Sequence, residues 1–276
     1  MTLAFTEVGD RVYVLRQPML DVNVTLVVGD GAALVVDTLS TAAQAAELVA
    51  AARELTSDPF VVVNTHHHFD HCFGNHTLAA DPSYPVYAHQ LTVERLRDQP
   101  ELVRRQAYDE VLPAEPALAT EVARTRILAP SHPVQYETTV DVGGRPVLLR
   151  HLGRGHTDGD LVVQVPDADV LVAGDLIEES GPPAFEDAYP LEWVETVAAL
   201  LRLTTPASVV VPGHGAVVGP DFVRAQHEDL AALAWLIRDG DADHSPVEQL
   251  ARHAPFGPEV ALTAVRRGYA ELRGDA

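Results

Sequence analysis

Four candidate metal ligands lie within six positions of one another, and no other segment constrains the structure as strongly. They are His66, His68, Asp70 and His71, within the sequence T-H-H-H-F-D-H at residues 65–71. The preceding residues, 60–63, are Phe-Val-Val-Val, a short apolar run typical of a buried strand. Alternate side chains of an extended segment share a face, so His66, His68 and Asp70 are expected to converge while His67 points away. The run predicts a metal site at the end of a strand.

Three later segments carry further candidate ligands, each after an apolar, strand-like run. The candidates are His156, Asp175 and His214, in the sequences G-H-T, G-D-L and G-H-G. Imidazole nitrogen and carboxylate oxygen suit zinc, iron or manganese better than calcium, which takes oxygen ligands almost throughout. A structural zinc site has four ligands, often thiolates, whereas here the candidates come from four segments and none is a Cys. This excess favours two metal ions with open coordination positions.

The order H-x-H-x-D-H, then His, Asp and His, resembles that of the metallo-β-lactamase-fold hydrolase superfamily, from about Asn23 to Gly215. The resemblance implies a first metal held by three histidines, a second held by an aspartate and two histidines, and one bridging carboxylate. These ligands are, in that order, His66, His68 and His156, then Asp70, His71 and His214, then Asp175. Two Zn²⁺ ions are the expected cofactors, with iron or manganese as alternatives. In two-metal hydrolases the ions lie roughly 3.5–4 Å apart and lower the pKa of a bound water to about 7.

The pattern of apolar runs predicts a single α/β domain over residues 1–276. About a dozen short strands alternate with helices, which is too many strands for one small sheet. Together with the resemblance, this implies a four-layer αββα sandwich, in which two mixed sheets lie face to face with helices outside. Single helices are expected over residues 91–105 and 247–272. The polar segment around residues 99–130 is expected to be a helical lid insertion, and the helices from residue 220 onward are expected to pack on the domain.

Several residues near the candidate ligands have two alternative roles. Asp37 resembles a buried acidic residue that, in the superfamily, hydrogen-bonds the first ligand loop; the alternative is a turn carboxylate. Asp160 is either a support for the third histidine ligand or a turn residue before the next strand. His76 and His89 are interpreted as packing or surface histidines, with outer contact to the metal site as the alternative. Cys72 is interpreted as a small buried residue.

The chain carries 40 acidic and 19 basic residues, which gives a formal net charge of −21. Because this charge is spread along the chain and repels phosphate backbones, nucleic acid is not expected as a partner, and a small-molecule substrate is expected instead. No long apolar stretch predicts a membrane span, and residues 1–7 show no secretory signal, so a cytoplasmic protein is expected. The sequence leaves the oligomeric state open.

The complete ligand set predicts a hydrolase that uses a metal-bound hydroxide on a small ester, thioester, lactone or amide. β-Lactamase activity is the first alternative. It is weakened because the chain contains no Lys to hold a substrate carboxylate, and because Asp175 stands where such enzymes commonly have a Cys. An alternative of another class is a mononuclear iron oxygenase similar to persulfide dioxygenases, disfavoured because Asp70, His71 and His214 are all present. A non-catalytic metal-binding protein is the remaining alternative.

Two residues are expected to act in catalysis. One is Asp70, in addition to its role as a ligand. The other is Tyr189, in the Pro- and Gly-containing loop that follows Asp175, where a phenol near the metals would donate a hydrogen bond to developing negative charge. Phe185 of the same loop is expected either to line the pocket or to pin the loop against the following helix.

Overall fold

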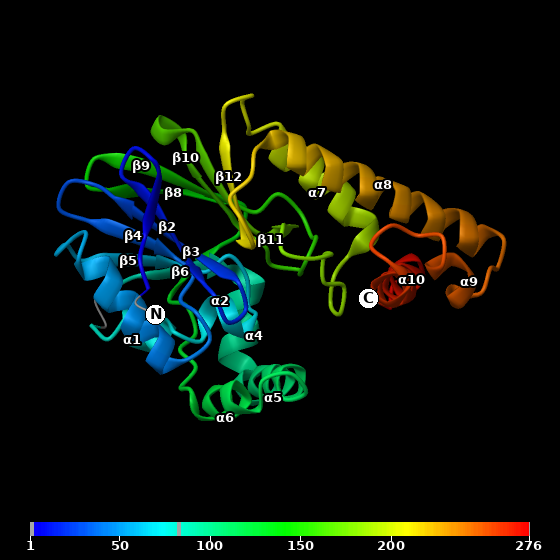
Figure 1. Cartoon of the computed structure of the whole chain (residues 1–276), viewed down its shortest axis with the longest axis horizontal. Coiled ribbons are helices and arrows are strands. Elements are labelled where there is room, and N and C mark those ends of the chain that lie inside the picture. The colour runs from blue at the N-terminus through cyan, green and yellow to red at the C-terminus, as the bar shows by residue number, and fades with distance from the viewer. Residues whose placement is uncertain (1–2, 82–83, 276) are drawn as a thin grey trace.

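The computed structural model describes residues 3–81 and 84–275. The strands are β1 (Thr6–Gly9), β2 (Val12–Gln17), β3 (Val22–Val28), β4 (Ala33–Val36), β5 (Phe60–Val63), β6 (Val86–His89), β7 (His132–Val134), β8 (Glu137–Val142), β9 (Arg145–Arg150), β10 (Val162–Val165), β11 (Val170–Glu178) and β12 (Val209–His214). The helices are α1 (Ala42–Arg53), α2 (Phe69–Cys72), α3 (Asn75–Leu78), α4 (Gln90–Asp98), α5 (Pro100–Val111), α6 (Pro116–Arg124), α7 (Pro190–Leu201), α8 (Pro220–Ala242), α9 (Val247–Ala251) and α10 (Pro258–Arg273). Figure 1 shows the strands gathered together, with α1 on one side of them and α7 and α8 on the other.

The strands form two halves. The first half has the order β7-β6-β5-β4-β3-β2-β1, and the second has the order β12-β11-β10-β9-β8. Both halves are mixed, since β4 to β7 run parallel and β11 runs parallel to β12, while the other neighbours are antiparallel. Val22 of β3 pairs with His214 of β12, which joins the halves through one contact at the edge. This continuity between the two expected sheets was not foreseen from the sequence.

Apolar side chains on both faces of the strands explain the four layers. Along β4, Leu34 and Val36 belong to a buried cluster that also contains residues of the second half, such as Val147 of β9. Ala33 and Val35 point the other way, toward the buried face of α1. The outer face of the second half packs on α7 and α8 through a separate buried cluster. The order helix, sheet, sheet, helix confirms the predicted αββα sandwich.

Two expected helices are each divided at a proline. The helix expected over residues 91–105 is α4 followed by α5, because Pro100 lacks an N–H and disfavours helical backbone in the residue before it. The helix expected over residues 247–272 is α9 followed by α10. The break contains Phe256 and Gly257, both at positive φ, before Pro258. Both single-helix predictions were therefore wrong at these positions.

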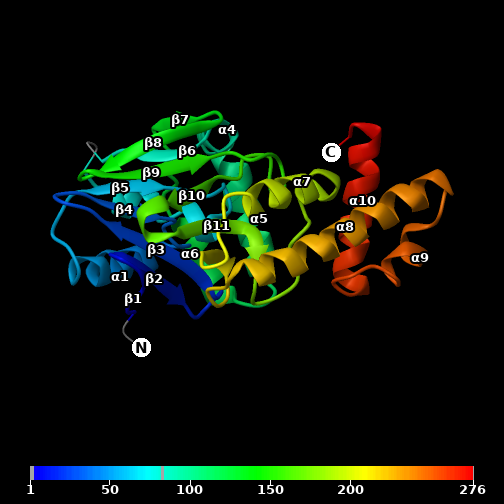
Figure 2. The same ribbon diagram turned by 90° about the horizontal axis from the view of Figure 1, so that it is seen from above.

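Two helical regions extend from the sandwich. Helices α5 and α6 pack on the short helix α2 through a buried cluster that includes Phe69, Val103 and Leu118. Helices α8, α9 and α10 form an arm beside α7, which Figure 2 shows from above, and Leu230, Leu233 and Ile237 of α8 are fully buried. In the part of the chain that the structure describes, no helix is long and apolar enough to cross a membrane.

Candidate metal centre

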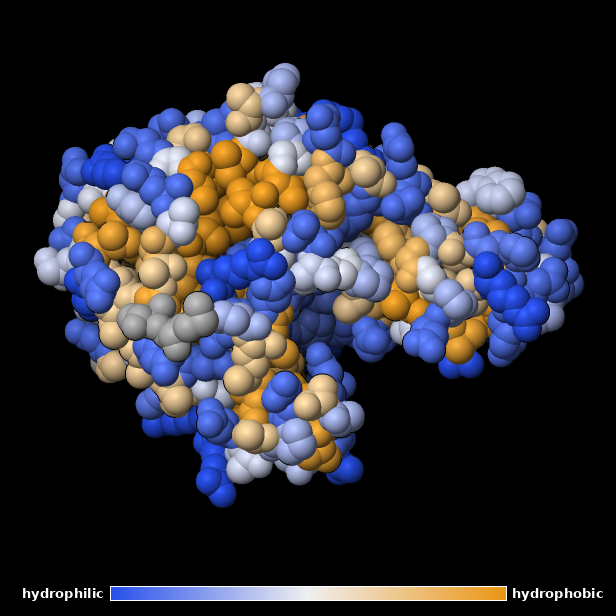
Figure 3. Space-filling view, viewed as in Figure 1, coloured by the Kyte–Doolittle hydropathy of each residue, from blue (hydrophilic) through white to orange (hydrophobic). Residues whose placement is uncertain are grey.

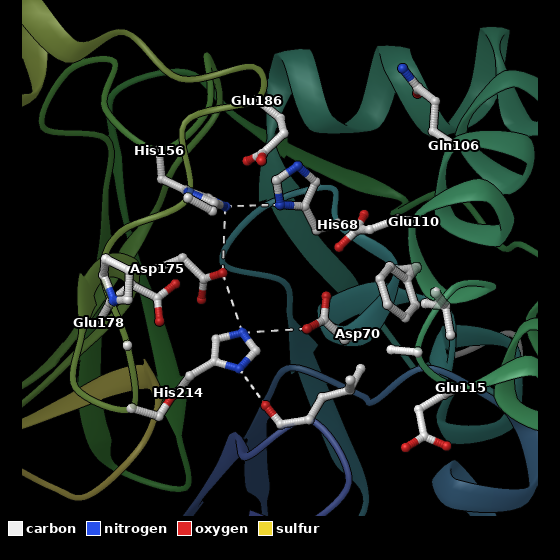
Figure 4. A pocket seen from close by; sticks show the side chains of 18 of the residues that line it. His68, Asp70, Gln106, Glu110, Glu115, His156, Asp175, Glu178, Glu186 and His214 are labelled. Carbon is white, nitrogen blue, oxygen red and sulfur yellow. Dashed lines mark hydrogen bonds and ion pairs between the residues drawn. The ribbon is translucent and has the colours of Figure 1, made fainter. Parts of the chain in front are cut away.

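The predicted ligands meet at one end of the sandwich, because Asp175 lies in the second half of β11, His214 ends β12, and the others lie in segments that follow a strand. The loop after β5 and the short helix α2 carry the first four, the loop between β9 and β10 carries His156, and β11 and β12 carry Asp175 and His214. Residues at strand ends are held by a rigid sheet while their side chains stay free of the core. The structure brings all seven predicted ligands into two neighbouring groups. Figure 4 shows five of them, His68, Asp70, His156, Asp175 and His214, around the cavity.

The first group consists of three histidines and one aspartate whose ligand atoms all lie within 4.8 Å of one another: His66, His68, His156 and Asp175. His68 Nδ1 lies 2.8 Å from His156 Nε2. Asp175 Oδ2 lies 3.4 Å from His156 Nε2 and 3.6 Å from His66 Nε2. Burial lowers the pKa of His156 to about 4, whereas the carboxylate of Asp187 outweighs burial and raises the pKa of His68 to about 9.

The second group consists of Asp70, His71 and His214. His71 Nε2 lies 3.3 Å from His214 Nε2, and Asp70 Oδ2 lies 3.3 Å from the same nitrogen. Asp175 also contacts this group, since its Oδ1 lies 3.2 Å from His71 Nε2 and its Oδ2 lies 3.4 Å from His214 Nε2. One carboxylate therefore touches both groups, as a bridging ligand would.

The donor set fits transition-metal ions. His66 Nε2 is buried, yet it has no hydrogen-bond partner among the described residues, and Asp175 Oδ1 makes no hydrogen bond although His71 Nε2 lies 3.2 Å away. Leaving buried polar atoms without partners costs about 1–3 kcal/mol each, which a bound cation would remove. Five imidazoles and two carboxylates, with no thiolate, match the preferences of zinc, iron and manganese.

Outer hydrogen bonds fix which nitrogen of His71 and of His214 faces the centre. Asp37, which is buried, accepts from His71 Nδ1 and from the backbone and hydroxyl of Thr65, each at 2.8 Å. This agrees with the expectation that Asp37 supports the first ligand loop. The backbone oxygen of Leu20 lies 2.7 Å from His214 Nδ1. In both histidines Nδ1 is used, so Nε2 is left to bind a metal.

The loop carrying His156 has its own support. Asp160 is buried and accepts hydrogen bonds from the backbone N–H and the hydroxyl of Thr157, next to His156. Asp160 therefore has both of the expected roles. It closes a turn, and this turn holds the ligand His156. Cys72 is buried and its thiol donates to the backbone oxygen of His67, in agreement with its expected role as a packing residue.

Sequence reasoning missed an ion-pair cluster behind His68. Asp187, in the loop after β11, contacts His68 Nε2 at 3.3 Å and His67 Nε2 at 3.2 Å. Arg95 of α4 lies 3.6 Å from Asp187 and 3.2 Å from Asp158. His67 thus faces this cluster instead of the predicted centre, as the alternation of side chains predicted. No local signal pointed to Asp187, because its partners are far away in the sequence.

The structure does not support a catalytic role for Tyr189. It is buried, and its ring is covered by the guanidinium groups of Arg154 and Arg267, at 4.1 and 5.6 Å from the ring centre. It is not among the residues that line the cavity at the centre. Phe185 is buried against Trp193 and Phe256, so its ring pins the loop to its neighbours. His89 stacks on His151, and no contact joins it to a predicted ligand in the described structure.

A cavity of about 730 Å³ opens beside the two groups and is lined by His68, Asp70, His156, Asp175 and His214 together with residues of α5, of the turn before α6 and of the loop after β11. Its volume lies in the range of small-molecule sites, about 300–1,000 Å³. Figure 3 shows the surface hollowed between the lobe formed by α5 and α6 and the helical arm. The centre is therefore open to a small molecule on one side.

Comparison with known proteins agrees with this geometry. The sequence profile of the Metallo-beta-lactamase superfamily matches residues 18–214. The chain is 26% identical to a metallo-beta-lactamase type 2 of Bacillus cereus over 159 residues, 56% of this chain and 52% of that protein. It is 30% identical to one from Bacillus sp. (strain 170) over 105 residues, 37% of this chain and 41% of that protein. The chain thus spans about half the length, or less, of these curated relatives.

Solved structures give the same fold. A metallo-beta-lactamase from Pontibacter korlensis superposes with a TM-score of 0.67 at 20% identity, over 83% of this chain and 99% of that one. The DIM-1 metallo-beta-lactamase superposes with a TM-score of 0.63 at 20% identity, over 83% and 96%. The profile match covers most of the chain and contains every predicted ligand. The chain therefore belongs to the metallo-β-lactamase superfamily.

Proposed function

We propose that the protein is a binuclear metal-dependent hydrolase of a small ester, thioester, lactone or amide. Family membership and the grouped His and Asp side chains support a metal-dependent hydrolase. The observation that carries the binuclear proposal is the position of Asp175, whose two carboxylate oxygens contact His66 and His156 of one group and His71 and His214 of the other. A mononuclear enzyme would not need the second group.

In this proposal the first metal is held by His66, His68 and His156, the second by Asp70, His71 and His214, and both by Asp175. When bound, two such ions polarise a carbonyl and supply hydroxide at neutral pH. Zinc is the metal we propose, and iron and manganese suit the same donors. Because Asp70 also lines the cavity, we assign it a second role, in which its carboxylate orients the attacking water and takes up a proton.

The segment around residues 99–130 supplies one wall of the cavity, through Gln106, Glu110 and Glu115. We propose that it acts as a fixed wall more than as a moving lid. Its two helices share a buried cluster with α2, and the Arg104 guanidinium donates to the backbone oxygen of Thr125 at 2.5 Å. Because the wall shares a buried cluster with α2, the helix that carries Asp70 and His71, the cavity keeps a fixed position relative to the metals.

β-Lactamase activity is the second candidate function, favoured by the names of the relatives. The cavity argues against it. A β-lactam antibiotic presents a carboxylate, yet among the described residues that line the cavity there is no Arg, and the chain has no Lys. The oxygenase alternative is disfavoured further because Asp70, His71 and His214 converge as a complete second group.

Metal analysis combined with a substrate panel tests the proposal. Protein expressed with ample metal is expected to hold close to two transition-metal ions per chain by elemental analysis. It is then assayed on a thioester, a lactone, a β-lactam and a phosphodiester. Turnover of the thioester or lactone above that of the other two supports the proposal, whereas at most one ion per chain would overturn the binuclear centre.

A further inference from the structure

We propose, on the basis of the binuclear centre described above, that Glu178 is an additional ligand of the second metal. This residue ends β11 and was not among the predicted ligands. With it, five side chains hold the second metal instead of four: Asp70, His71, Asp175, Glu178 and His214. The added donor is a carboxylate, so the inference also concerns which metal ions the second site favours.

An irregularity in β11 turns Glu178 to the same side as Asp175. In a regular strand successive side chains alternate between faces, so residues 175 and 178 would point in opposite directions. Between Gly174 and Glu178 the pairing with β12 is irregular, since Gly174 pairs with Pro212 and Glu178 pairs with His214. Four steps along β11 thus match two steps along β12, as in a bulge, and bulges often reorient side chains next to active sites. As a result both carboxylates lie close to His214.

The Glu178 carboxylate lies among the groups assigned to the second metal. The ligand atoms of Asp175, Glu178 and His214 all lie within 4.8 Å of one another, the same limit that joins the members of the first group. Figure 4 shows the three side chains together on one side of the cavity. Glu178 is only 9% exposed, so it is largely withdrawn from water. Its position is therefore that of a candidate ligand and not that of a surface carboxylate.

Helix α8 fixes the backbone at this point. Gln226, which is buried, accepts a hydrogen bond from the backbone N–H of Glu178 at 3.0 Å, and its side-chain amide donates to the backbone oxygen of Leu176 at 2.9 Å. The backbone N–H of Glu179 donates to the backbone oxygen of His214 at 3.1 Å. Glu178 is therefore tied both to α8 and to the strand that carries His214. A ligand held in this way needs little rearrangement when an ion binds.

Three carboxylates lie around the His214 imidazole. Asp70 Oδ2 lies 3.3 Å from His214 Nε2, Asp175 Oδ2 lies 3.4 Å from it, and Glu178 is the third. Like charges brought together away from water repel one another, which is costly unless a positive ion lies between them. A divalent ion bound by all three carboxylates removes this cost, whereas an ion bound by two leaves the charge of Glu178 uncompensated.

The added carboxylate changes the metal preference of the second site. Zinc usually takes four ligands in proteins, and four are supplied without Glu178. Manganese suits carboxylate oxygen and accepts up to six donors, so it gains more from a fifth side chain. Because zinc still binds more tightly than manganese to a given set of ligands, the effect of Glu178 is on the ratio of the two affinities.

Metal titrations of metal-free, full-length protein test the inference. Calorimetry with Mn²⁺ and with Zn²⁺ gives the dissociation constants of both sites for each ion. Glu178→Gln keeps the size of the side chain and removes its charge, so we expect one Mn²⁺ constant to rise about 100-fold and the matching Zn²⁺ constant about 10-fold or less. Glu178→Asp keeps the charge but shortens the side chain, and should weaken Mn²⁺ binding about 10-fold. Full Mn²⁺ affinity in Glu178→Asp would show that charge alone matters, and would overturn direct ligation.

Glu186→Gln is the matched control, since Glu186 also lines the cavity but belongs to none of the ligand groups. It should leave the dissociation constants unchanged, and circular dichroism checks that each variant is folded. If Glu178→Gln binds two Mn²⁺ ions as tightly as the wild type does, the inference is wrong and the binuclear centre stands. If the wild type binds at most one ion of either metal, the binuclear centre and the inference are both wrong.

Discussion

The floor of the cavity and its wall are built in opposite ways. The floor consists of the five predicted ligands that line the cavity, with His66 and His71 beside them, and the wall consists of α5, the turn before α6 and the loop at residues 178–186. On the floor, polar atoms are mostly buried and His71 and His214 each have a second nitrogen held by an outer partner. On the wall, carboxylates such as Glu115 and Glu186 are exposed and have no ion pair in the described structure. The floor fixes the chemistry, while the wall is free to select the substrate.

Removing the bridging carboxylate tests the floor most severely. Asp175→Ala takes away the one side chain that contacts both ligand groups, so we expect metal content to fall by about one ion per chain. Turnover should fall roughly 10³-fold or more, since metal ions stabilise the transition state by several kcal/mol. Elemental analysis and steady-state kinetics on the same preparation measure both effects.

The fold of this variant is expected to persist, because Asp175 is not part of the apolar clusters. Circular dichroism checks this. Asp239→Ala, an exposed position on α8, serves as the control and should retain both metals. Near wild-type turnover of Asp175→Ala would mean that this carboxylate does not bridge two metals, and would contradict the proposed binuclear centre.

Asp187 directly follows the loop of the wall and contacts His68 of the floor. A variant at this position therefore tests whether a residue next to the wall affects metal binding. Asp187→Asn removes the charge that faces His68 Nε2 and Arg95. Outer partners of metal-binding histidines typically contribute 10–100-fold to metal affinity, and we expect a loss of about that size at the first metal. Competition with a chromophoric chelator measures the affinity. Asp158→Asn also loses a contact with Arg95 but none with a predicted ligand, and should have the smaller effect.

The difference between floor and wall also explains what the sequence predicts. The ligands were predictable because metal chemistry restricts residue types, and because alternation along a strand places His66 and His68 on one face. Asp187 and Glu178 were not predictable as site residues. An isolated acidic residue in a polar loop carries no local pattern, and only the fold brings it to its partners. The helix breaks at Pro100 and Pro258 were also missed, because the spacing of apolar residues continues across both prolines and gave no sign of a break.

Acid is expected to weaken the packing of α4 through His89, which caps that helix. Its Nδ1 accepts from Leu91 N–H, and its Nε2 lies 3.2 Å from the backbone oxygen of Gln135, so the folded state favours the neutral ring. Burial and His151 lower its pKa to about 4, below the ordinary value of 6.5. In this interval the unfolded chain binds a proton that the folded protein does not. Stability contributed by neutral His89 is therefore complete above pH 6.5 and is lost as the pH falls toward 4.

His89→Gln isolates this contribution. Denaturant unfolding of metal-free protein at pH 7 and at pH 4.5 should show the wild type losing on the order of 1–3 kcal/mol more than the variant on acidification. His132→Gln is a suitable control, since His132 is exposed. An equal loss of unfolding free energy in wild type and variant would show that His89 does not contribute to the acid sensitivity.

The smallest effect is expected at Tyr189, next to the wall but outside it. The Tyr189 ring is covered by Arg154 and Arg267, and Tyr189→Phe keeps these contacts because it changes only the hydroxyl. We expect turnover and metal content to stay within about twofold of the wild type, whereas loss of a donor to a developing oxyanion would cost about 10²–10³-fold. Kinetics on the best substrate of the panel decide between the two. Tyr189→Ala, which also removes the ring, should lower the melting temperature while leaving kcat nearly unchanged if the residue only anchors α7. A large loss of turnover in Tyr189→Phe would show that the Tyr189 hydroxyl acts on the reacting atoms, and Tyr189 would then count as part of the substrate site.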